Sequence, residues 1–221
     1  MPPTARREFL TVSSMALAAM AVPDTAIGQA AADPIIDIHQ HVNYSGRPNA
    51  VLLAHQRAMG ITTTILLPSG RPVQSRSTHD GVANGLQAEA LGNEACERFS
   101  REHPREFVVG ANEVPDVKGA TEQIARYLKR GAVLIGEQKF GVDCDAPAML
   151  RIYELAREHR VPVLMHWQFK MYNYGFDRFY KMLEKYPKVT FIGHAQTWWA
   201  NIDKQHADQS VLYPKGPVTR G

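Results

Sequence analysis

The chain has 221 residues, of which 44% are hydrophobic and 21% are charged. This composition is ordinary for a soluble globular protein and argues against a collagen, a disordered chain or a solenoid. The 25 basic and 22 acidic residues give a net charge of +3. Because the basic residues are scattered along the chain, we expect no nucleic-acid partner. Cys96 and Cys144 lack CxxC spacing, so they could form at most one disulfide bridge and leave the redox compartment open.

The first thirty residues have the order of an export signal. Paired arginines open the segment Arg6-Arg7-Glu8-Phe9-Leu10, an apolar stretch follows over 11–22, and small residues stand before Ala30. This order resembles a twin-arginine signal peptide. The apolar stretch is shorter than the roughly 20 residues that a membrane-spanning helix needs. We therefore expect residues 1–30 to be removed after Ala30, leaving a periplasmic protein without a stable membrane anchor. The alternative is a disordered basic N-terminus.

Six short apolar runs alternate with segments of helical period from residue 34 onward. The strand-like runs cover 35–42, 61–67, 107–112, 132–140, 161–167 and 189–195. Between them, residues 119–130 place Ile124, Tyr127 and Leu128 on one helical face, and residues 147–159 do the same with Met149 and Ile152. The longest interval predicts a loop that faces substrate, followed by a helix over 82–101. With no Pro-rich linker, residues 31–221 form one predicted domain.

Most of these runs begin roughly 25 to 30 residues apart, which is typical of consecutive βα units in a parallel sheet. Two architectures are built from such units. A closed (β/α)8 barrel needs eight, whereas a doubly wound open sheet can stop at five or six. Periodicity alone does not distinguish between them, so the positions of the reactive side chains must decide.

Four of the nine histidines stand where predicted strands end. Asp37, His39 and His41 alternate along the end of the first run, so they share one strand face. His166 closes the fifth run, and His194 closes the sixth. A lone histidine at a strand end is usually a packed core residue, but a set at the carboxyl ends of parallel strands predicts a metal site. Three imidazole nitrogens and one open position suit a catalytic divalent ion, with Zn²⁺ expected and Mn²⁺ as an alternative.

The DIHQH motif over 37–41, together with His166 and His194, resembles the amidohydrolase superfamily, in its branch of aminocarboxymuconate-semialdehyde decarboxylase-like enzymes. The resemblance implies a (β/α)8 TIM barrel of metal-dependent hydrolase type, of which about six βα units are present in this chain. It implies that His39, His41 and His166 bind the metal and that His194 is catalytic. It also implies that Asp37 orients the two histidines that follow it and fixes their tautomers.

Lys139 lies on one face of the fourth run together with Glu137. The resemblance offers Lys139 a role as a bridging metal ligand; the alternatives are a cation for a substrate carboxylate and an internal ion pair. Trp167, Trp198 and Trp199 follow the histidines and either wall an aromatic pocket or pack in the core. The remaining histidines are expected at the surface: His55, His79, His103, His159 and His206.

The chain departs from the superfamily pattern after His194. The superfamily has an aspartate at the end of an eighth strand, whereas the last 27 residues here hold no apolar run followed by Asp, and Asp203 and Asp208 lie in polar surroundings. The sequence therefore reads as a truncated fragment of a longer protein. We expect a metal-dependent hydrolase that opens a lactone, amide or ester of a small molecule. The alternatives are a metal-dependent decarboxylase and an inactive metal-binding fragment. A homo-oligomer is compatible with either activity.

Overall fold

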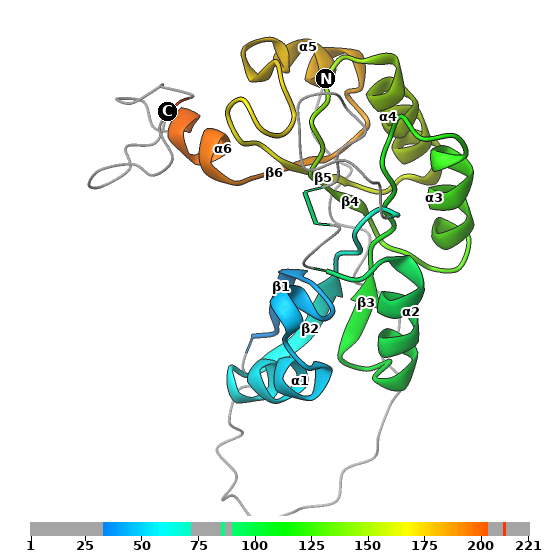
Figure 1. Cartoon of the computed structure of the whole chain (residues 1–221), viewed down its shortest axis with the longest axis vertical. Helices are drawn as coiled ribbons and strands as arrows, with labels where there is room; N and C mark the ends of the chain where they lie inside the picture. The colour runs from blue at the N-terminus through cyan, green and yellow to red at the C-terminus, as the bar shows by residue number, and fades with distance from the viewer. Residues whose placement is uncertain (1–32, 72–84, 87–89, 203–209, 211–221) are drawn as a thin grey trace, which may run out of the picture. The chain divides into compact units, whose positions relative to one another are not determined.

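The fold is described from a computed structural model, over residues 33–71, 85–86, 90–202 and 210. The predicted signal segment, residues 1–30, lies outside the described residues. Strands and helices alternate from Ile35 onward (Figure 1). The strands are β1 (Ile35–Gln40), β2 (Ile61–Leu66), β3 (Phe107–Val109), β4 (Ile135–Gln138), β5 (Val163–His166) and β6 (Phe191–His194). The α-helices are α1 (Asn49–Ala58), α2 (Asn93–Glu102), α3 (Ala120–Leu128), α4 (Pro147–His159), α5 (Tyr180–Lys185) and α6 (Gln196–Asn201), with 3₁₀ turns at Tyr44–Gly46 and Phe176–Arg178.

The order of the strands decides between the two architectures. Strands β1, β2 and β3 form one parallel sheet in chain order, and β4, β5 and β6 form a second. A parallel bridge between Ala111 and Ile135 links the end of the third strand to the fourth. A doubly wound sheet reverses its strand order at a switch point, whereas a barrel keeps neighbours in chain order. The described residues therefore form a partial α/β barrel, which confirms the predicted fold class.

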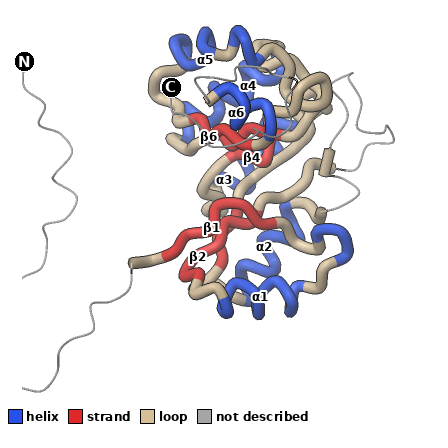
Figure 2. Tube along the Cα trace, turned by 90° about the vertical axis from the view of Figure 1, so that its left-hand side faces the viewer, coloured by secondary structure: helices blue, strands red, loops and turns tan. Residues whose placement is uncertain are grey.

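Apolar side chains pack on both sides of the strands. On the inner side, Leu67, Leu134 and Leu164 form a buried cluster. On the outer side, α3, α4 and α5 contribute to the largest cluster together with residues of β4 and β5. Helix α1 packs against β2 and α2 against β3, and Figure 2 shows α1 and α2 beside β1 and β2. The predicted faces of α3 and α4 are buried, including Ile124 and Met149, each 0% exposed. Burying one such side chain contributes about 1.5 to 3 kcal/mol.

The long segment before β3 differs from its prediction. Within the predicted helix 82–101, the described residues become helical only at Asn93, where α2 begins. Gly92 is extended, and the backbone N–H of Leu91 donates to the carbonyl of Val42, at the end of β1. Residues 90–92 are therefore tied to the strand ends and cannot join the helix. Leu86, which the sequence placed in the predicted helix, lines the pocket described below, whereas most of the predicted substrate-facing loop lies outside the described residues.

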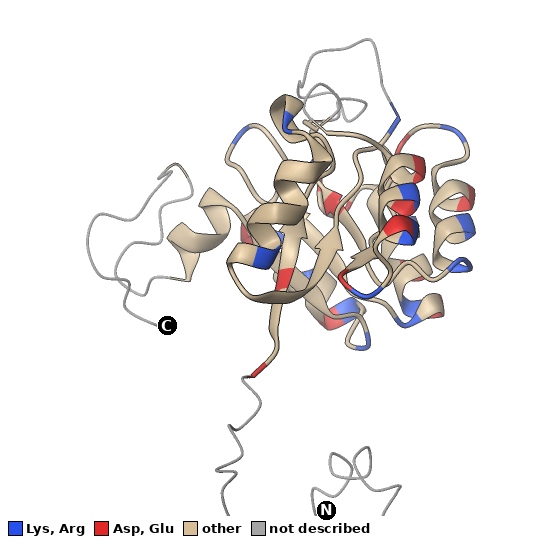
Figure 3. Cartoon of the chain, turned by 90° about the horizontal axis from the view of Figure 1, so that it is seen from below, with Lys and Arg blue, Asp and Glu red and all other residues tan. Residues whose placement is uncertain are grey.

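Charged side chains are mixed on the outer helices (Figure 3). On α2, Glu97 pairs with Arg101 at 3.0 Å and with Arg130, which follows α3, at 2.5 Å. Exposed pairs of this kind contribute little to stability, typically below about 1 kcal/mol. Among the described residues, no helix is both long and apolar enough to cross a membrane. Cys96 and Cys144 are buried and free, so the possible disulfide bridge between them is not formed.

Candidate metal centre

Four histidines and one glutamate converge at the carboxyl ends of the strands. His39 and His41 come from β1 and the residues just after it, Glu137 from β4, His166 from β5 and His194 from β6. In a parallel barrel these ends meet at one face, which is where barrel enzymes place their chemistry. The structure therefore brings together all four histidines that the sequence placed at strand ends, and adds a carboxylate among them.

The two histidines of the DIHQH motif lie side by side. Their Nε2 atoms are 3.2 Å apart, and the Nδ1 of His41 lies 2.8 Å from the carbonyl oxygen of Leu67. That contact makes Nδ1 the hydrogen-bond donor and leaves Nε2 of His41 free to bind a metal. The pairing of β1 with β2 is irregular between Asp37 and Gln40, so the simple alternation of side chains is broken in the segment that contains His39.

Asp37 supports this segment in a different way from the prediction. Its Oδ1 accepts the backbone N–H of His39 at 2.9 Å, and its Oδ2 accepts the side-chain amides of Gln40 at 2.8 Å and Gln56 at 3.3 Å. Among the described residues, its carboxylate contacts no imidazole ring. The expectation that Asp37 fixes the tautomers is thus corrected: Leu67 does so for His41, and Asp37 holds the backbone that carries His39.

Glu137 is the centre of the cluster. Its Oε2 lies 3.4 Å from Nε2 of His39 and 3.2 Å from Nε2 of His41, while its Oε1 lies 2.5 Å from Nδ1 of His166 and 3.6 Å from Nε2 of His194. The side chain is 2% exposed. Burial alone would raise the pKa of Glu137, but contacts with His166, His39 and His41 hold it well below its usual range. Glu137 is therefore ionised at neutral pH.

Glu137 is an addition to the predicted site, since the sequence placed it on one face with Lys139 and indicated no role for it. In a regular strand Leu134 and Glu137 would face opposite sides, because the side-chain period is two. The pairing of β4 with β5 shifts between Ile135 and Gln138, and as a result Leu134 faces the inner apolar cluster while Glu137 faces the histidines. The signal available in the sequence was an ionisable residue inside an apolar run, which a buried strand accepts only with partners.

His166 and His194 are register partners on adjacent strands, and their rings meet edge to face with centroids 5.1 Å apart. The ring of His194 also lies 4.2 Å from that of His39. Burial and the neighbouring His39 lower the pKa of His194 to about 4. His194 is thus a neutral imidazole at neutral pH, which is the form that can bind a metal.

Two overlapping sets of side chains could each hold a metal ion. One set is His39, His41 and Glu137, the other is Glu137, His166 and His194, and within each set the ligand atoms lie within 4.8 Å of one another. Imidazole nitrogen with carboxylate oxygen is a donor set that suits Zn²⁺ and other divalent transition ions. The residues present therefore fit a divalent metal, and Glu137 belongs to both sets.

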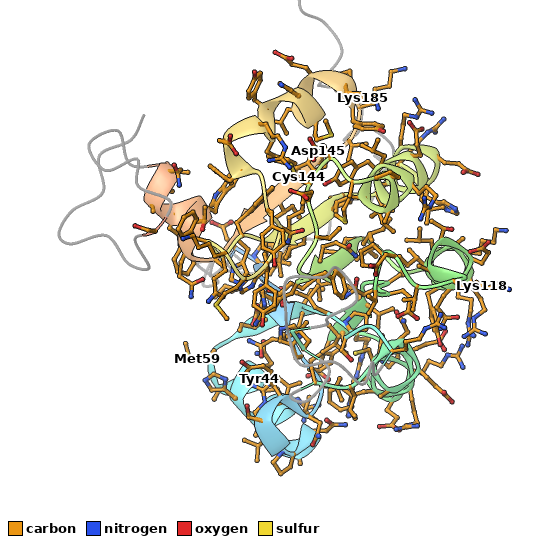
Figure 4. All side chains as sticks on the ribbon, turned by 45° about the horizontal axis from the view of Figure 1, so that its top comes forward. Tyr44, Met59, Lys118, Cys144, Asp145 and Lys185 are labelled. Carbon is orange, nitrogen blue, oxygen red and sulfur yellow. The ribbon has the colours of Figure 1, made fainter. Side chains whose placement is uncertain are left out.

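A pocket of about 390 Å³ opens over these side chains. Besides the cluster, its lining includes Lys139, Arg47, Leu86 and Tyr44, which stacks on His41 at 5.5 Å and is labelled in Figure 4. Its remaining lining residues are Gln40, Gln168 and Gln196. Among the described residues, Nε of Arg47 and Oε1 of Gln196 are buried without a hydrogen-bond partner. An unsatisfied donor and acceptor on lining residues suit a polar ligand.

Lys139 lies at the pocket with its Nζ over the ring of Tyr172, 5.3 Å from the ring centre. Among the described residues it forms no ion pair, so the internal ion pair considered from the sequence is not formed there. Trp167 is a core residue, fully buried against Phe176 and Phe179.

The other two tryptophans also lie outside the pocket lining. Trp198 packs against the largest apolar cluster. Trp199 is 40% exposed, and its ring lies edge-on to that of His194, with the ring centres 5.8 Å apart. Of the two alternatives predicted for the tryptophans, the pocket wall is therefore not seen in the described lining, which holds none of them.

The histidines that were expected at the surface differ in their exposure. His55 is exposed, whereas His103 and His159 are only half-buried, and His103 packs between Phe99 and Phe107. The predictions for His79, His206, Asp203 and Asp208 fall outside the described residues.

Solved barrel structures resemble the chain. An uncharacterised TIM-barrel protein from Bordetella bronchiseptica aligns with a TM-score of 0.54 at 13% identity, over 76% of this chain and 69% of that protein. 2,6-Dihydroxybenzoate decarboxylase in complex with 2,6-dihydroxybenzoate aligns with a TM-score of 0.51 at 16% identity, over 85% of this chain and 76% of that enzyme. 2,6-Dihydroxybenzoate decarboxylase from Rhizobium gives a TM-score of 0.50 at 16% identity, over 85% and 75%. At these identities the likeness establishes the fold, an α/β barrel. The chain matches no protein-family model and no curated protein in sequence.

Proposed function

We propose that the protein is a metal-dependent hydrolase of the amidohydrolase superfamily that acts on a lactone, amide or ester of a small molecule. The observation that carries the proposal is the buried, ionised Glu137 with four imidazoles around it at the carboxyl ends of parallel strands. Burying a carboxylate is costly even when it has partners, and ionisable groups gathered in a pocket with a shifted pKa are typical of functional sites. The order of the histidines along the chain, HxH followed by His166 and His194, supports this superfamily.

The proposed metal-binding residues are His39, His41, His166 and Glu137, and Zn²⁺ is the proposed ion, with Mn²⁺ as the alternative. An ion bound there supplies Lewis acidity, which polarises a carbonyl and makes water acidic near neutral pH. Neutral His194 is proposed to hold the carbonyl oxygen of the substrate through an N–H. Lys139 is proposed to hold a carboxylate of the substrate, because it lines the pocket and forms no ion pair among the described residues.

Hydrolysis is tested by loading the purified chain with Zn²⁺ and measuring the opening of a panel of lactones, esters and amides, with and without a carboxylate. We expect turnover that is lost on chelation and in His39→Ala. The matched control is His55→Ala, an exposed histidine away from the pocket, which should keep full turnover. Zinc binding without turnover of any lactone, ester or amide would contradict the hydrolase proposal, and absence of carbon dioxide release as well would support a non-catalytic metal-binding role.

A second candidate function is non-oxidative decarboxylation, which is favoured by the small number of carboxylate side chains in the pocket. Among the described lining residues, Glu137 is the only carboxylate, and its contacts with the histidines occupy both of its oxygens. Hydrolysis needs a group that takes a proton from water, whereas loss of carbon dioxide from a bound carboxylate needs a proton donor to the ring or chain carbon. Release of carbon dioxide from aromatic carboxylic acids, with no lactone opening by the same zinc-loaded sample, would favour this candidate.

Export is a separate proposal. We propose that residues 1–30 direct the protein to the periplasm through the twin-arginine route, on the evidence of Arg6-Arg7, the short apolar stretch and the small residues before Ala30. The test is the mass of the protein recovered from the periplasm of expressing cells. A mass that corresponds to a chain starting directly after Ala30 supports the proposal. Replacing Arg6 and Arg7 by lysine should keep the uncleaved precursor inside the cell. A periplasmic form that retains Arg6 and Arg7 would overturn it.

A further inference from the structure

Two buried asparagines beside the metal centre form hydrogen bonds to the backbone that carries its ligands. Asn112, fully buried at the end of the third strand, donates from Nδ2 to the carbonyl of Glu137 at 2.7 Å and to that of Pro68 at 2.9 Å. Its Oδ1 accepts the side-chain amide of Gln138 at 2.6 Å. Its backbone N–H and C=O both bond the side chain of Asn93, the first residue of α2. Every hydrogen-bonding group of Asn112 is therefore used.

Asn173 forms the corresponding link on the other side of β4. Its Nδ2 donates to the carbonyl of Gln138 at 2.6 Å and to that of His166 at 2.7 Å, and its backbone N–H donates to the carbonyl of Phe140 at 2.8 Å. The residue is 4% exposed and has a left-handed φ of 51°, which asparagine tolerates better than most residues. In both asparagines only the NH₂ group can face two carbonyls, so the amide orientation follows from the contacts.

These bonds fall where the pairing of β4 with β5 is irregular. The pairing of β4 with β5 shifts between Ile135 and Gln138, so the consecutive carbonyls of Glu137 and Gln138 are both held by side-chain amides. Each amide bridges two elements: Asn112 joins Pro68, after β2, to β4, and Asn173 joins β4 to β5. The two elements joined by Asn173 carry Glu137 and His166, whose side chains meet at 2.5 Å.

We propose that Asn112 and Asn173 are positioning residues of the metal centre, which set the separation between Glu137 and His166 by holding the backbones that carry them. The proposal rests on the proposed metal function, in that its main readout is metal affinity. Groups that orient the ligands of a metal typically change its affinity by about 10- to 100-fold when they are removed. A purely structural amide would instead lower the stability of the fold and leave metal affinity unchanged.

Asn173 is the residue to vary first, because it is the less extensively bonded of the two. Asn173→Gly removes the amide and keeps the left-handed backbone unstrained, and Asn173→Asp keeps the shape but turns lone pairs toward two carbonyls. The matched control is Ser100→Ala, which also removes a side-chain donor to a strand carbonyl, that of Phe107 at 2.7 Å. Phe107 begins β3, at the end of the strand remote from the metal ligands. Asn112→Asp is the second test, and it retains the acceptor for Gln138.

The experiment measures Zn²⁺ affinity by competition with a chromophoric chelator, together with the urea unfolding midpoint of each metal-free variant. We expect Asn173→Gly and Asn173→Asp to bind Zn²⁺ about 10- to 100-fold more weakly than the wild type, and Ser100→Ala to bind it with wild-type affinity. If Asn173→Gly and Asn173→Asp bind Zn²⁺ as tightly as Ser100→Ala does at a similar loss of stability, the asparagine is merely structural and the proposal is overturned.

A metal-free readout separates this proposal from the proposed function. In the apo protein, the proton between Nδ1 of His166 and Glu137 should give a downfield NMR signal, because an imidazole N–H that donates to a buried carboxylate forms a charge-assisted hydrogen bond. We expect Asn173→Gly to shift or remove the signal and Ser100→Ala to retain it. If the wild type binds no Zn²⁺, the metal function fails, while this signal still decides the role of Asn173: an unchanged signal in Asn173→Gly overturns it.

Discussion

Replacing Glu137 by glutamine tests the metal centre at its shared ligand. The substitution keeps the size and shape of the side chain, so it removes one negative charge with little change in packing. Because Glu137 belongs to both candidate metal sets, its loss should weaken every mode of metal binding at this site. His39→Ala or His166→Ala, by contrast, each removes a ligand from only one set.

The expected magnitude follows from the geometry of the ligands. In each set the ligand atoms lie within 4.8 Å of one another. A point equidistant from three atoms at that spacing lies about 2.8 Å from each, and at that distance a divalent ion and one negative charge attract by about 3 kcal/mol even in the dielectric of water. A tenfold change in affinity corresponds to about 1.4 kcal/mol. Glu137→Gln should therefore weaken Zn²⁺ binding by more than about a hundredfold.

The assay is titration of the metal-free protein with Zn²⁺ against a competing chelator. The matched control is Glu113→Gln, since Glu113 is also 2% exposed and is bonded by Arg71, but does not line the pocket. We expect Glu113→Gln to destabilise the fold and leave Zn²⁺ affinity at the wild-type value. Wild-type affinity in Glu137→Gln, or an equal loss in both variants, would refute the assignment of Glu137 as a shared ligand.

The other predictions concern reactivity, substrate charge and pH. Burial raises the pKa of both Cys96 and Cys144 to about 12, so neither thiol should react with a thiol reagent at pH 8 until urea unfolds the chain; prompt labelling of the folded protein would contradict this. Lys139→Gln should raise KM about tenfold for carboxylated substrates and leave uncharged ones unaffected, because a hydrogen bond to a charge contributes about 1.5 to 3 kcal/mol; equal changes for both kinds would be inconsistent with a carboxylate contact. A hydrogen bond from Arg178 lowers the pKa of Asp145 below 3.8. Its contribution to stability is therefore present above that pH and is lost as the pH falls through the lowered pKa, so the difference in Tm between wild type and Arg178→Gln should be largest near pH 7 and shrink below about pH 4.

Most of the fold was predictable because the repeating units of a parallel barrel leave a strong pattern in sequence. Each of the six predicted strand runs contains a strand, and α4 occupies the predicted residues 147–159. The strands end earlier than their predicted apolar runs, by one to three residues. The predicted start of the helix at residue 82 was wrong, because the backbone hydrogen bond from Leu91 to Val42 competes with helix formation there. Hydrogen bonds between distant segments leave no local signal in the sequence.

The histidines of the site could be predicted from the sequence, but its glutamate could not. Histidines at the ends of apolar runs are rare enough to be noticed, and His39, His41, His166 and His194 do meet in space. Glu137 was placed on the same face as Lys139 but given no role, because its partners are histidines of three other strands, and contacts between distant segments leave no local signal in the sequence. The sequence assigned the orienting role to the nearer acidic residue, Asp37, whereas the contacts to the rings come from a residue far along the chain.

The contacts of Glu137 also bear on the curvature of the sheet. His166 and His194 reach the cluster by ordinary pairing of neighbouring strands, but two strands, β2 and β3, stand between β1 and β4 in the sheet order. In a flat sheet three strand spacings would separate β1 from β4 by about 14 Å, which is further than glutamate and histidine side chains can span. The 3.2 Å separation of Glu137 from His41 therefore requires the sheet to curl toward its inner face. The same curvature that defines a barrel brings the HxH motif onto the carboxylate of β4, so the fold and the metal centre depend on one geometric condition.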